Sequence, residues 1–173
     1  MSTLVTFYAL TDADAIAKDK TDTAATNESK IIQASTTASV AERELKKAAE
    51  LLLGCVPKRM KATVLCDTQT QAEALDEFIW QYPPDKFIPH NLFGEGPAAG
   101  TPAEIVWQSA YLSMTKLRNR QFVINLSGEY IERHHDIMHI IDFVPEDEDQ
   151  KAAARLRYKQ YKQAGCQLEY KTA

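Results

Sequence analysis

Three glycines lie close together in the middle of the chain, where a phosphate-binding loop could form. They are Gly94, Gly96 and Gly100, in the stretch FIPHNLFGEGPAAGTPAEIVW (residues 87–107). Glycine-rich loops hold phosphate with backbone N–H groups, and in P-loops a lysine follows the last glycine. Here no lysine follows any of the three, and Glu95 adds negative charge between two of them. We therefore expect a rigid turn between a helix and a strand, without a phosphate site.

A group of histidines could instead ligate a metal ion. His134, His135 and His139 lie around Asp136, and these residue types are common zinc ligands. We place the boundary between a helix and a strand near Asp136, so His135 and His139 would not share one helical face. We therefore favour solvent-exposed histidines at a junction, and no metal site.

Other catalytic patterns are incomplete. Ser127 and Gly128 follow an expected strand, but the GxSxG pattern of a nucleophile turn is absent. His90 stands alone beside Asn91 and is typical of a hydrogen-bonded turn residue. Asp76 and its neighbour Glu77 are adjacent on an expected helix, so the two carboxylates point apart. The sequence predicts a protein that is not an enzyme and needs no cofactor; a nucleotide-dependent α/β enzyme is the alternative.

Length and composition are those of a single soluble domain spanning residues 1–173. Of 173 residues, 45% are hydrophobic and 25% charged, and no apolar run approaches the roughly 20 residues of a membrane span. The amino terminus has no basic region ahead of its apolar run, which argues against a secretory signal. The cysteines, Cys55, Cys66 and Cys166, form no CxxC pair and are typical of reduced thiols. We expect a cytoplasmic protein that does not contact membranes.

Strand and helix patterns alternate along the chain. Strands are expected at Leu4–Leu10, Ala62–Asp67, Ala103–Trp107, Gln121–Leu126 and in DIMHIIDFVP, which we take as the last strand. Helices are expected from Ser39, as N-cap, to Gly54, in TQTQAEALDEFIWQY, in SGEYIERHH and in EDEDQKAAARLRYKQYKQAG. Residues 12–37 are rich in Thr, Ala, Asp, Ser and Lys and predict a flexible insert. The alternation predicts an α/β fold: a mostly parallel twisted sheet with helices on both faces.

Charge is unevenly distributed between the body and the end of the chain. The net charge is −4, yet the segment from Lys151 to Ala173 has six basic residues and one acid, hence +5, which leaves −9 for the first 150 residues. An acidic body would repel a nucleic-acid backbone, so we expect nucleic acid to be bound only indirectly. Direct binding through this tail is a second alternative.

The last helix places its cations on one side. At 100° per residue, four of them fall within about 80° of each other: Lys151, Arg155, Lys159 and Lys162. Tyr158 lies along the edge of this stripe, and Val144 precedes the helix. The opposite side carries the expected packing face: Ala153, Ala154, Tyr161 and Ala164. Bases near the end of a helix can simply answer the helix dipole. The functional interpretation is a groove for a peptide that is acidic and ends in a hydrophobic residue.

Four blocks of the sequence resemble a known family. They are TFYAL, QAEALDEFIWQYPPDKFIPHNLFGEGPAAGTPAEIVW, IDFVP and ARLRYKQYKQAG, and they occur in the order found in the chi subunit of bacterial DNA polymerase III. The resemblance covers Leu4–Thr11 and Ser39–Leu168 and omits the expected insert. It implies a nucleotide-binding-like α/β fold without a working phosphate loop.

The resemblance also implies partners and sites. Chi proteins are non-catalytic accessory subunits of the clamp-loader assembly that pair with the psi subunit and bind the acidic, phenylalanine-ended tail of single-stranded DNA-binding protein. The positions that match the tail-binding groove are Val144, Lys151, Arg155, Tyr158, Lys159 and Lys162. The psi surface, which a related helicase is also thought to use, includes the position of Phe87, and we add its neighbours Trp80 and Pro83. Core packing is the alternative for these three residues, since Phe and Trp near a helix end are often buried.

Overall fold

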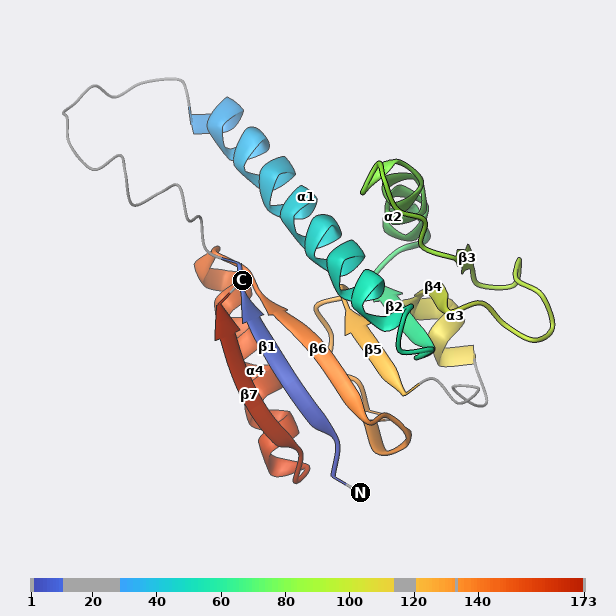
Figure 1. Ribbon diagram of the computed structural model, residues 1–173. Coiled ribbons are helices and arrows are strands. Elements are labelled where there is room, and N and C mark those ends of the chain that lie inside the picture. The colour runs from blue at the N-terminus through green and yellow to red at the C-terminus, as the bar shows by residue number, and fades with distance from the viewer. Residues whose placement is uncertain (1, 11–28, 114–120, 133, 173) are drawn as a thin grey trace.

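The computed structural model describes residues 2–10, 29–113, 121–132 and 134–172 (Figure 1). Its strands form one open sheet of seven in the order β3-β4-β2-β5-β6-β1-β7, and every pair is parallel. The strands are β1 Leu4–Ala9, β2 Ala62–Cys66, β3 His90–Leu92, β4 Ala103–Trp107, β5 Phe122–Asn125, β6 His139–Val144 and β7 Gln167–Thr172. The predicted α/β class with a parallel sheet is confirmed.

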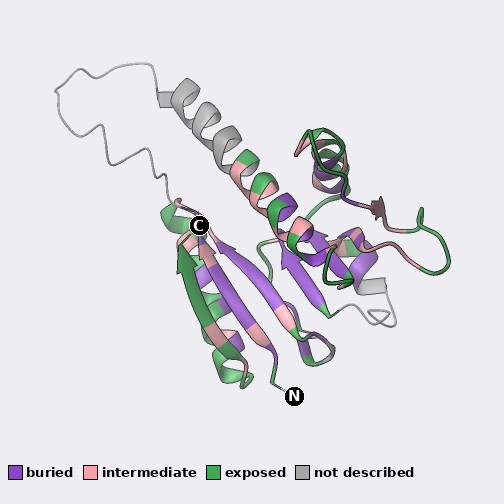
Figure 2. Ribbon diagram, viewed as in Figure 1, coloured by how far each residue is buried: buried purple, intermediate pink, exposed green. Residues whose placement is uncertain are grey.

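Two pairs of helices cover opposite faces of this sheet. They are α1 Ser29–Cys55 and α2 Gln69–Gln81 on one face, and α3 Gln108–Ser113 and α4 Glu148–Gln163 on the other. Leu52 and Leu75 belong to the first apolar core, whereas Tyr111 and Tyr161 belong to the second. The central strands are buried on both sides (Figure 2), which explains their continuous apolar sequences. Within the described part of the chain, no helix is long and apolar enough to cross a membrane.

The order of the strands explains why the helices divide between two faces. The chain moves from β1 to β2 and then outward to β3, and later returns from β4 to β5 on the other side of β2. Crossovers between parallel strands are right-handed, so opposite directions of travel place the helices on opposite faces. The carboxyl ends of β2 and β5 therefore lie where the chain direction reverses, which is where proteins of this class bind ligands.

The expected insert is partly wrong. Helix α1 begins at Ser29, so residues 29–37, expected to belong to a flexible insert with little helix, are helical, and Ser39 lies inside the helix instead of capping it. Residues 12–28 of that prediction lie outside the described residues. The carboxyl half of α1 is held by Ala48, Ala49 and Leu52. Extending a helix that is already anchored costs far less than starting one, which explains why a polar sequence continues it.

Three other expectations need correction. The segment after β5 is not a helix: Asn125 and Ser127 accept hydrogen bonds from the backbone N–H groups of Ser127 and Glu129, and such local bonds compete with helix formation. A 3₁₀ helix follows at His134–Asp136. Strand β3 was missed because it has only three residues, and β7 because its residues are mostly exposed and polar. Strand β6 is therefore not the last.

Candidate functional site

Helix α4 carries most of the expected groove, and local sequence explains its start and end. The Asp147 carboxylate accepts hydrogen bonds from the N–H groups of Asp149 and Gln150, at 3.1 and 3.0 Å. This cap satisfies two N–H groups that have no partner within the helix. Gly165 follows the helix with φ 79°, a conformation that favours glycine. The expected helix and its glycine stop are confirmed.

The buried side of α4 includes a charged residue that the sequence analysis missed. Arg157 is 6% exposed and donates from Nε and Nη2 to the two carboxylate oxygens of Asp142 on β6, at 3.0 and 2.9 Å. It also donates to the carbonyl oxygens of Gly128 and Phe143. The positive charge of Arg157 is therefore buried and does not add to the exposed charge of the segment from Lys151 to Ala173. Asp142 inside an otherwise apolar strand was the signal that could have revealed a buried partner.

The packing face of α4 is also narrower than expected. Ala154 and Tyr161 are buried as expected, and the Tyr161 hydroxyl accepts a hydrogen bond from the N–H of Ile131 at 3.1 Å. Ala153 and Ala164 are exposed, so their assignment to the core was wrong. On this side of the helix, the buried side chain is Arg157 instead of the two alanines. The helix is thus fixed by one ion pair and two apolar residues, and the rest of its surface faces solvent.

The structure brings all six residues of the expected groove together. These six line one concavity of about 600 Å³ together with three further residues. We call it the basic groove, and its lining is Phe7, Val144, Lys151, Ala154, Arg155, Tyr158, Lys159, Lys162 and Tyr170. Phe7, Ala154 and Tyr170 were not expected there. Phe7 could have been found as the inward residue of the first strand, but Tyr170 could not, because β7 itself was not predicted.

The floor of the basic groove is aromatic. Phe7 is 1% exposed, and its ring lies 5.4 Å from the ring of Tyr158 on α4. Tyr170 stands beside Phe7 in the register of β1 and β7, yet it remains 61% exposed. The groove therefore has an apolar base between an edge strand and a helix, and an aromatic side chain of a ligand could contact the exposed rings of Tyr158 and Tyr170.

The rim of the basic groove carries cations that are largely uncompensated. Lys151 bonds to Glu148 at 2.8 Å, and this hydrogen bond holds the pKa of that carboxyl below its usual value. Within the described ranges, no carboxylate forms an ion pair with Arg155, Lys159 or Lys162. Exposed cations on one side of a helix repel one another. Carboxylates of a ligand would relieve this repulsion and form charge-assisted hydrogen bonds with them.

A second candidate surface lies at the opposite edge of the sheet. Trp80 at the end of α2 is 61% exposed and Phe87 is 64% exposed, and their rings lie 5.9 Å apart. His90 lies beneath Trp80, with 4.9 Å between ring centroids. Pro83 is half-buried. We call Trp80 and Phe87 the aromatic ledge. Core packing, the alternative considered for these residues, is wrong for both aromatic side chains.

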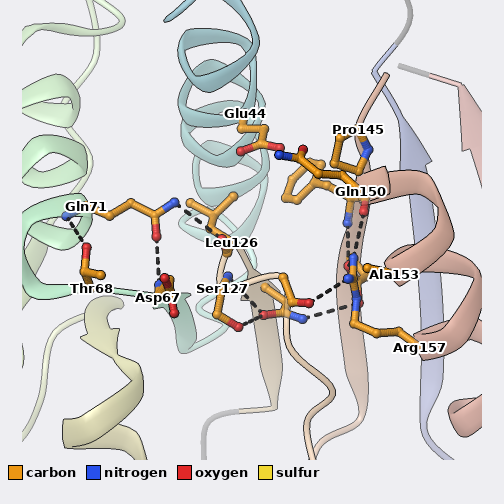
Figure 3. Close-up of a pocket in the computed structure, with 14 residues that line it drawn as sticks. Glu44, Asp67, Thr68, Gln71, Leu126, Ser127, Pro145, Gln150, Ala153 and Arg157 are labelled. Carbon is orange, nitrogen blue, oxygen red and sulfur yellow. Dashed lines mark hydrogen bonds and ion pairs between the residues drawn. The ribbon is translucent and has the colours of Figure 1, made fainter. Parts of the chain in front are cut away.

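A third concavity lies at the carboxyl ends of β2, β5 and β6, where the chain direction reverses (Figure 3). It measures about 380 Å³, and Glu44, Asp67 and Asp142 contribute carboxyl groups to its lining. Burial raises the pKa of the Glu44 carboxyl to about 7, and the nearby Asp142 adds to the rise. The one cation of its lining, Arg157, is already bonded to Asp142. This pocket is therefore poor in the donors that a phosphate needs.

The glycine stretch does not contribute to that pocket. Gly94 and Gly100 have φ values of 88° and 74° and form turns between β3 and β4. Gly96 lies against Asn91, where an added Cβ would come within 2.6 Å of the side-chain oxygen. These glycines serve turns and close packing, but the turns connect the strands β3 and β4 instead of the helix and strand that the sequence predicted, because β3 was missed.

The histidines do not converge either. His134 is buried rather than solvated, because its ring packs against Tyr130 and Tyr161 and its Nδ1 lies 3.2 Å from the carbonyl of Ile131. His139 instead contacts Thr6 on the sheet at 2.8 Å. Among the described residues, no three His, Cys, Asp or Glu side chains are grouped so that they could hold a metal ion.

Comparison with known families identifies the family of this chain. The family model described as DNA polymerase III chi subunit, HolC, matches residues 3–169. The chain belongs to this family. The resemblance inferred from the four sequence blocks is therefore confirmed, and membership identifies a DNA polymerase III chi subunit, a protein of DNA replication.

Two curated relatives are similar in sequence to this chain. The DNA polymerase III subunit chi of Haemophilus influenzae is 42% identical over 108 residues, which cover 62% of this chain and 72% of that protein. The subunit of the same name from Escherichia coli is 37% identical over 112 residues, covering 65% and 74%. A solved structure, "The crystal structure of T4 UvsW", aligns with 99% of this chain and 41% of its own, with a TM-score of 0.64. At 12% identity, this likeness concerns the fold alone.

Proposed function

We propose that this chi subunit is a non-catalytic adaptor that links the clamp loader, through psi, to the acidic carboxyl-terminal tail of single-stranded DNA-binding protein. The basic groove is the observation that carries the proposal. Its rim has four cations on one side of α4, and its floor is formed by Phe7, Tyr158 and Tyr170. Adjacent cations and aromatic rings fit a short peptide that combines carboxylates with an aromatic residue.

The free carboxylate of such a peptide favours arginine. A guanidinium can donate two parallel hydrogen bonds to a carboxylate, whereas a lysine acts as a point charge. Arg155 is the exposed arginine of the basic groove. We assign it to the terminal carboxylate, and the three lysines to the acidic side chains that precede it.

The aromatic ledge is the second contact in this proposal. We assign it to psi, or to a related helicase in place of psi, with Phe87 and Trp80 at its centre and Pro83 beside them. The ledge lies near β3 and the basic groove near β7, at opposite edges of the sheet (Figure 1). Both partners could therefore bind together, and tethering would raise the effective concentration of the clamp loader near coated DNA. The adaptor would act in the cytoplasm, with no direct contact to DNA.

The pocket at the carboxyl ends of the strands favours an adaptor over a nucleotide-dependent enzyme. The turn from β2 to α2 consists of Asp67 and Thr68, and the Thr68 hydroxyl already accepts a bond from the N–H of Gln71. A nucleotide would have to approach three carboxyl groups at this edge. Heating the protein with ATP or NAD should leave its melting temperature unchanged.

Fluorescence anisotropy with a labelled acidic peptide ending in phenylalanine tests the proposal. We expect micromolar binding by the wild type and a loss of about tenfold or more in affinity for Arg155→Ala. Lys58→Ala is the matched control, because it removes an exposed cation from the turn between α1 and β2, outside the lining of the basic groove. Equal affinity of Arg155→Ala and wild type would refute the groove assignment. Tighter binding of a bare oligonucleotide than of the peptide would favour direct nucleic-acid binding instead.

A further inference from the structure

Helix α2 presents an acidic stripe beside the aromatic ledge. At 100° per residue, three acids lie within about 60° of Trp80 around the helix: Glu73, Asp76 and Glu77. Glu73 and Glu77 are exposed, and Asp76 is half-buried. The buried residues of α2, Ala72, Leu75 and Ile79, lie on the other side. The stripe and Trp80 thus share the surface of α2 that faces away from the core.

The carboxylates of the stripe contact glutamine and histidine side chains. Glu73 accepts a hydrogen bond from Gln69 at 2.9 Å, and Glu77 accepts one from Gln81 at 2.6 Å. Asp76 lies 3.2 Å from Nε2 of His90, the residue that supports Trp80 from below. Within the part of the chain that the structure describes, no lysine or arginine pairs with any of these acids.

The cations near the ledge do not cancel this charge. Asp85 and Lys86, both exposed, lie between Pro84 and Phe87 and offset each other. The amino group of Lys46 on α1 lies over the ring of Tyr82, the residue that follows α2, at 5.7 Å from the ring centroid. The ledge is therefore a pair of exposed aromatic rings bordered by an excess of negative charge.

We propose that the aromatic ledge and its acidic stripe bind a partner segment that is apolar at its centre and carries lysine or arginine at its rim. The inference rests on the proposed function, in which that partner is psi. It adds that the psi segment must carry positive charge at its rim. Aromatic rings at the centre of an interface are desolvated on binding and supply affinity. Complementary charges at the rim speed association and reject wrong partners.

The basic groove carries positive charge and the acidic stripe carries negative charge, so the two surfaces favour different partners. The acidic stripe on α2 repels the acidic peptide that suits the basic groove on α4, and the cations of α4 repel a segment with a basic rim. Repulsion at the wrong site contributes to specificity as much as attraction at the right one. One small domain can thus hold two partners without exchanging them, although both sites centre on exposed aromatic rings.

Association kinetics with psi from the same organism test the inference. The double variant Glu73→Gln/Glu77→Gln should bind psi about threefold to tenfold more slowly than wild type at about 0.05 M salt, and the difference should shrink at about 0.5 M salt. The matched control, Glu129→Gln/Glu132→Gln, removes the same charge from the exposed loop after β5 and should leave the rate near that of wild type. Trp80→Ala should raise the dissociation rate at both salt concentrations.

The outcomes separate this inference from the proposed function. If Trp80→Ala weakens psi binding but the α2 charge variant associates as fast as wild type, the ledge binds psi and the basic rim is refuted. An equal slowing by the control pair also refutes it, because only the net charge would then matter. If psi does not bind, or if Trp80→Ala binds as tightly as wild type, the assignment of the ledge in the proposed function fails.

Discussion

Arg157 of α4 and Asp142 of β6 form a two-pronged ion pair in the interior, with 3.0 and 2.9 Å between their donor and acceptor atoms. The remaining bonds of the pair also stay inside the protein: Asn125 donates to Asp142, and Gly128 and Phe143 accept from Arg157. This network fixes the rotation of α4 on the sheet. The other bases of the helix must consequently face outward, where they form the rim of the basic groove.

Removing one partner of this pair should strongly destabilise the fold. Asp142→Ala leaves the Arg157 guanidinium buried without its counter-charge, so we expect the free energy of unfolding to fall by about 3–5 kcal/mol. Urea unfolding followed by circular dichroism measures the change. Lys159→Met, which alters an exposed cation on the same helix, should change stability by less than about 0.5 kcal/mol. Similar values for both variants would show that the ion pair does not anchor α4.

Tyr170 should contribute to peptide binding in the basic groove. Tyr170→Ala removes one aromatic wall of the groove, and we expect a loss of about threefold to tenfold in affinity for an acidic peptide ending in phenylalanine. Tyr170→Phe keeps the ring and should retain most of the affinity. A peptide ending in alanine supplies the control, since it should bind both Tyr170→Ala and wild type equally weakly. A loss of the same size with both peptides would mean that Tyr170 does not contact the aromatic end.

Glu44 should make stability depend on pH near neutrality. Burial raises its pKa from 4.5 to about 7, so the folded protein holds this proton more tightly than the unfolded chain does. The stability contributed by the protonated form is complete below pH 4.5 and is lost as pH rises toward 7. Glutamine resembles the protonated acid. Glu44→Gln should therefore match wild type near pH 4.5 and exceed its stability by about 1–3 kcal/mol at pH 8.

Comparing the two proteins at each pH isolates this effect. Burial lowers the pKa of His139, which makes stability rise with pH, opposite to the effect of Glu44, but this happens in both proteins. Its contribution cancels in the difference between Glu44→Gln and wild type. Urea unfolding at several pH values gives the curve, and a difference that is constant across pH would contradict the raised pKa of Glu44.

Asp147 should stabilise the folded protein because it caps the amino terminus of α4. Asp147→Ala removes the acceptor of two hydrogen bonds from the N–H groups of Asp149 and Gln150, which should lower the unfolding free energy by about 1 kcal/mol. Asp147→Asn keeps an acceptor and should lose much less. A drop in melting temperature for Asp147→Ala alone is the expected result, and equal melting temperatures for all three proteins would show that the cap is dispensable.

The sequence alone was sufficient for features that depend on local pattern. The apolar run of β2 and the glycine after α4 predict their elements because hydrophobic pattern and helix-ending signals act over a few residues. The same periodicity placed Arg155 and Lys159 on one side of α4, and the resemblance to the chi family assigned those positions a partner. The absence of a lysine after Gly100 was enough to argue against a phosphate loop.

Tertiary structure decided what depends on contacts between distant residues. Strand β7 has an exposed, polar sequence, and only its backbone bonds to β1 make it a strand; without it, Tyr170 could not be assigned to the basic groove. Arg157 and Lys159 look alike in the sequence, yet one is buried because Asp142 lies opposite it on β6, and the other faces solvent. The exposure of Trp80 and Phe87 likewise depends on what packs around α2. Burial is a property of the assembled layers, so a local pattern cannot determine which charges and rings remain available to a partner.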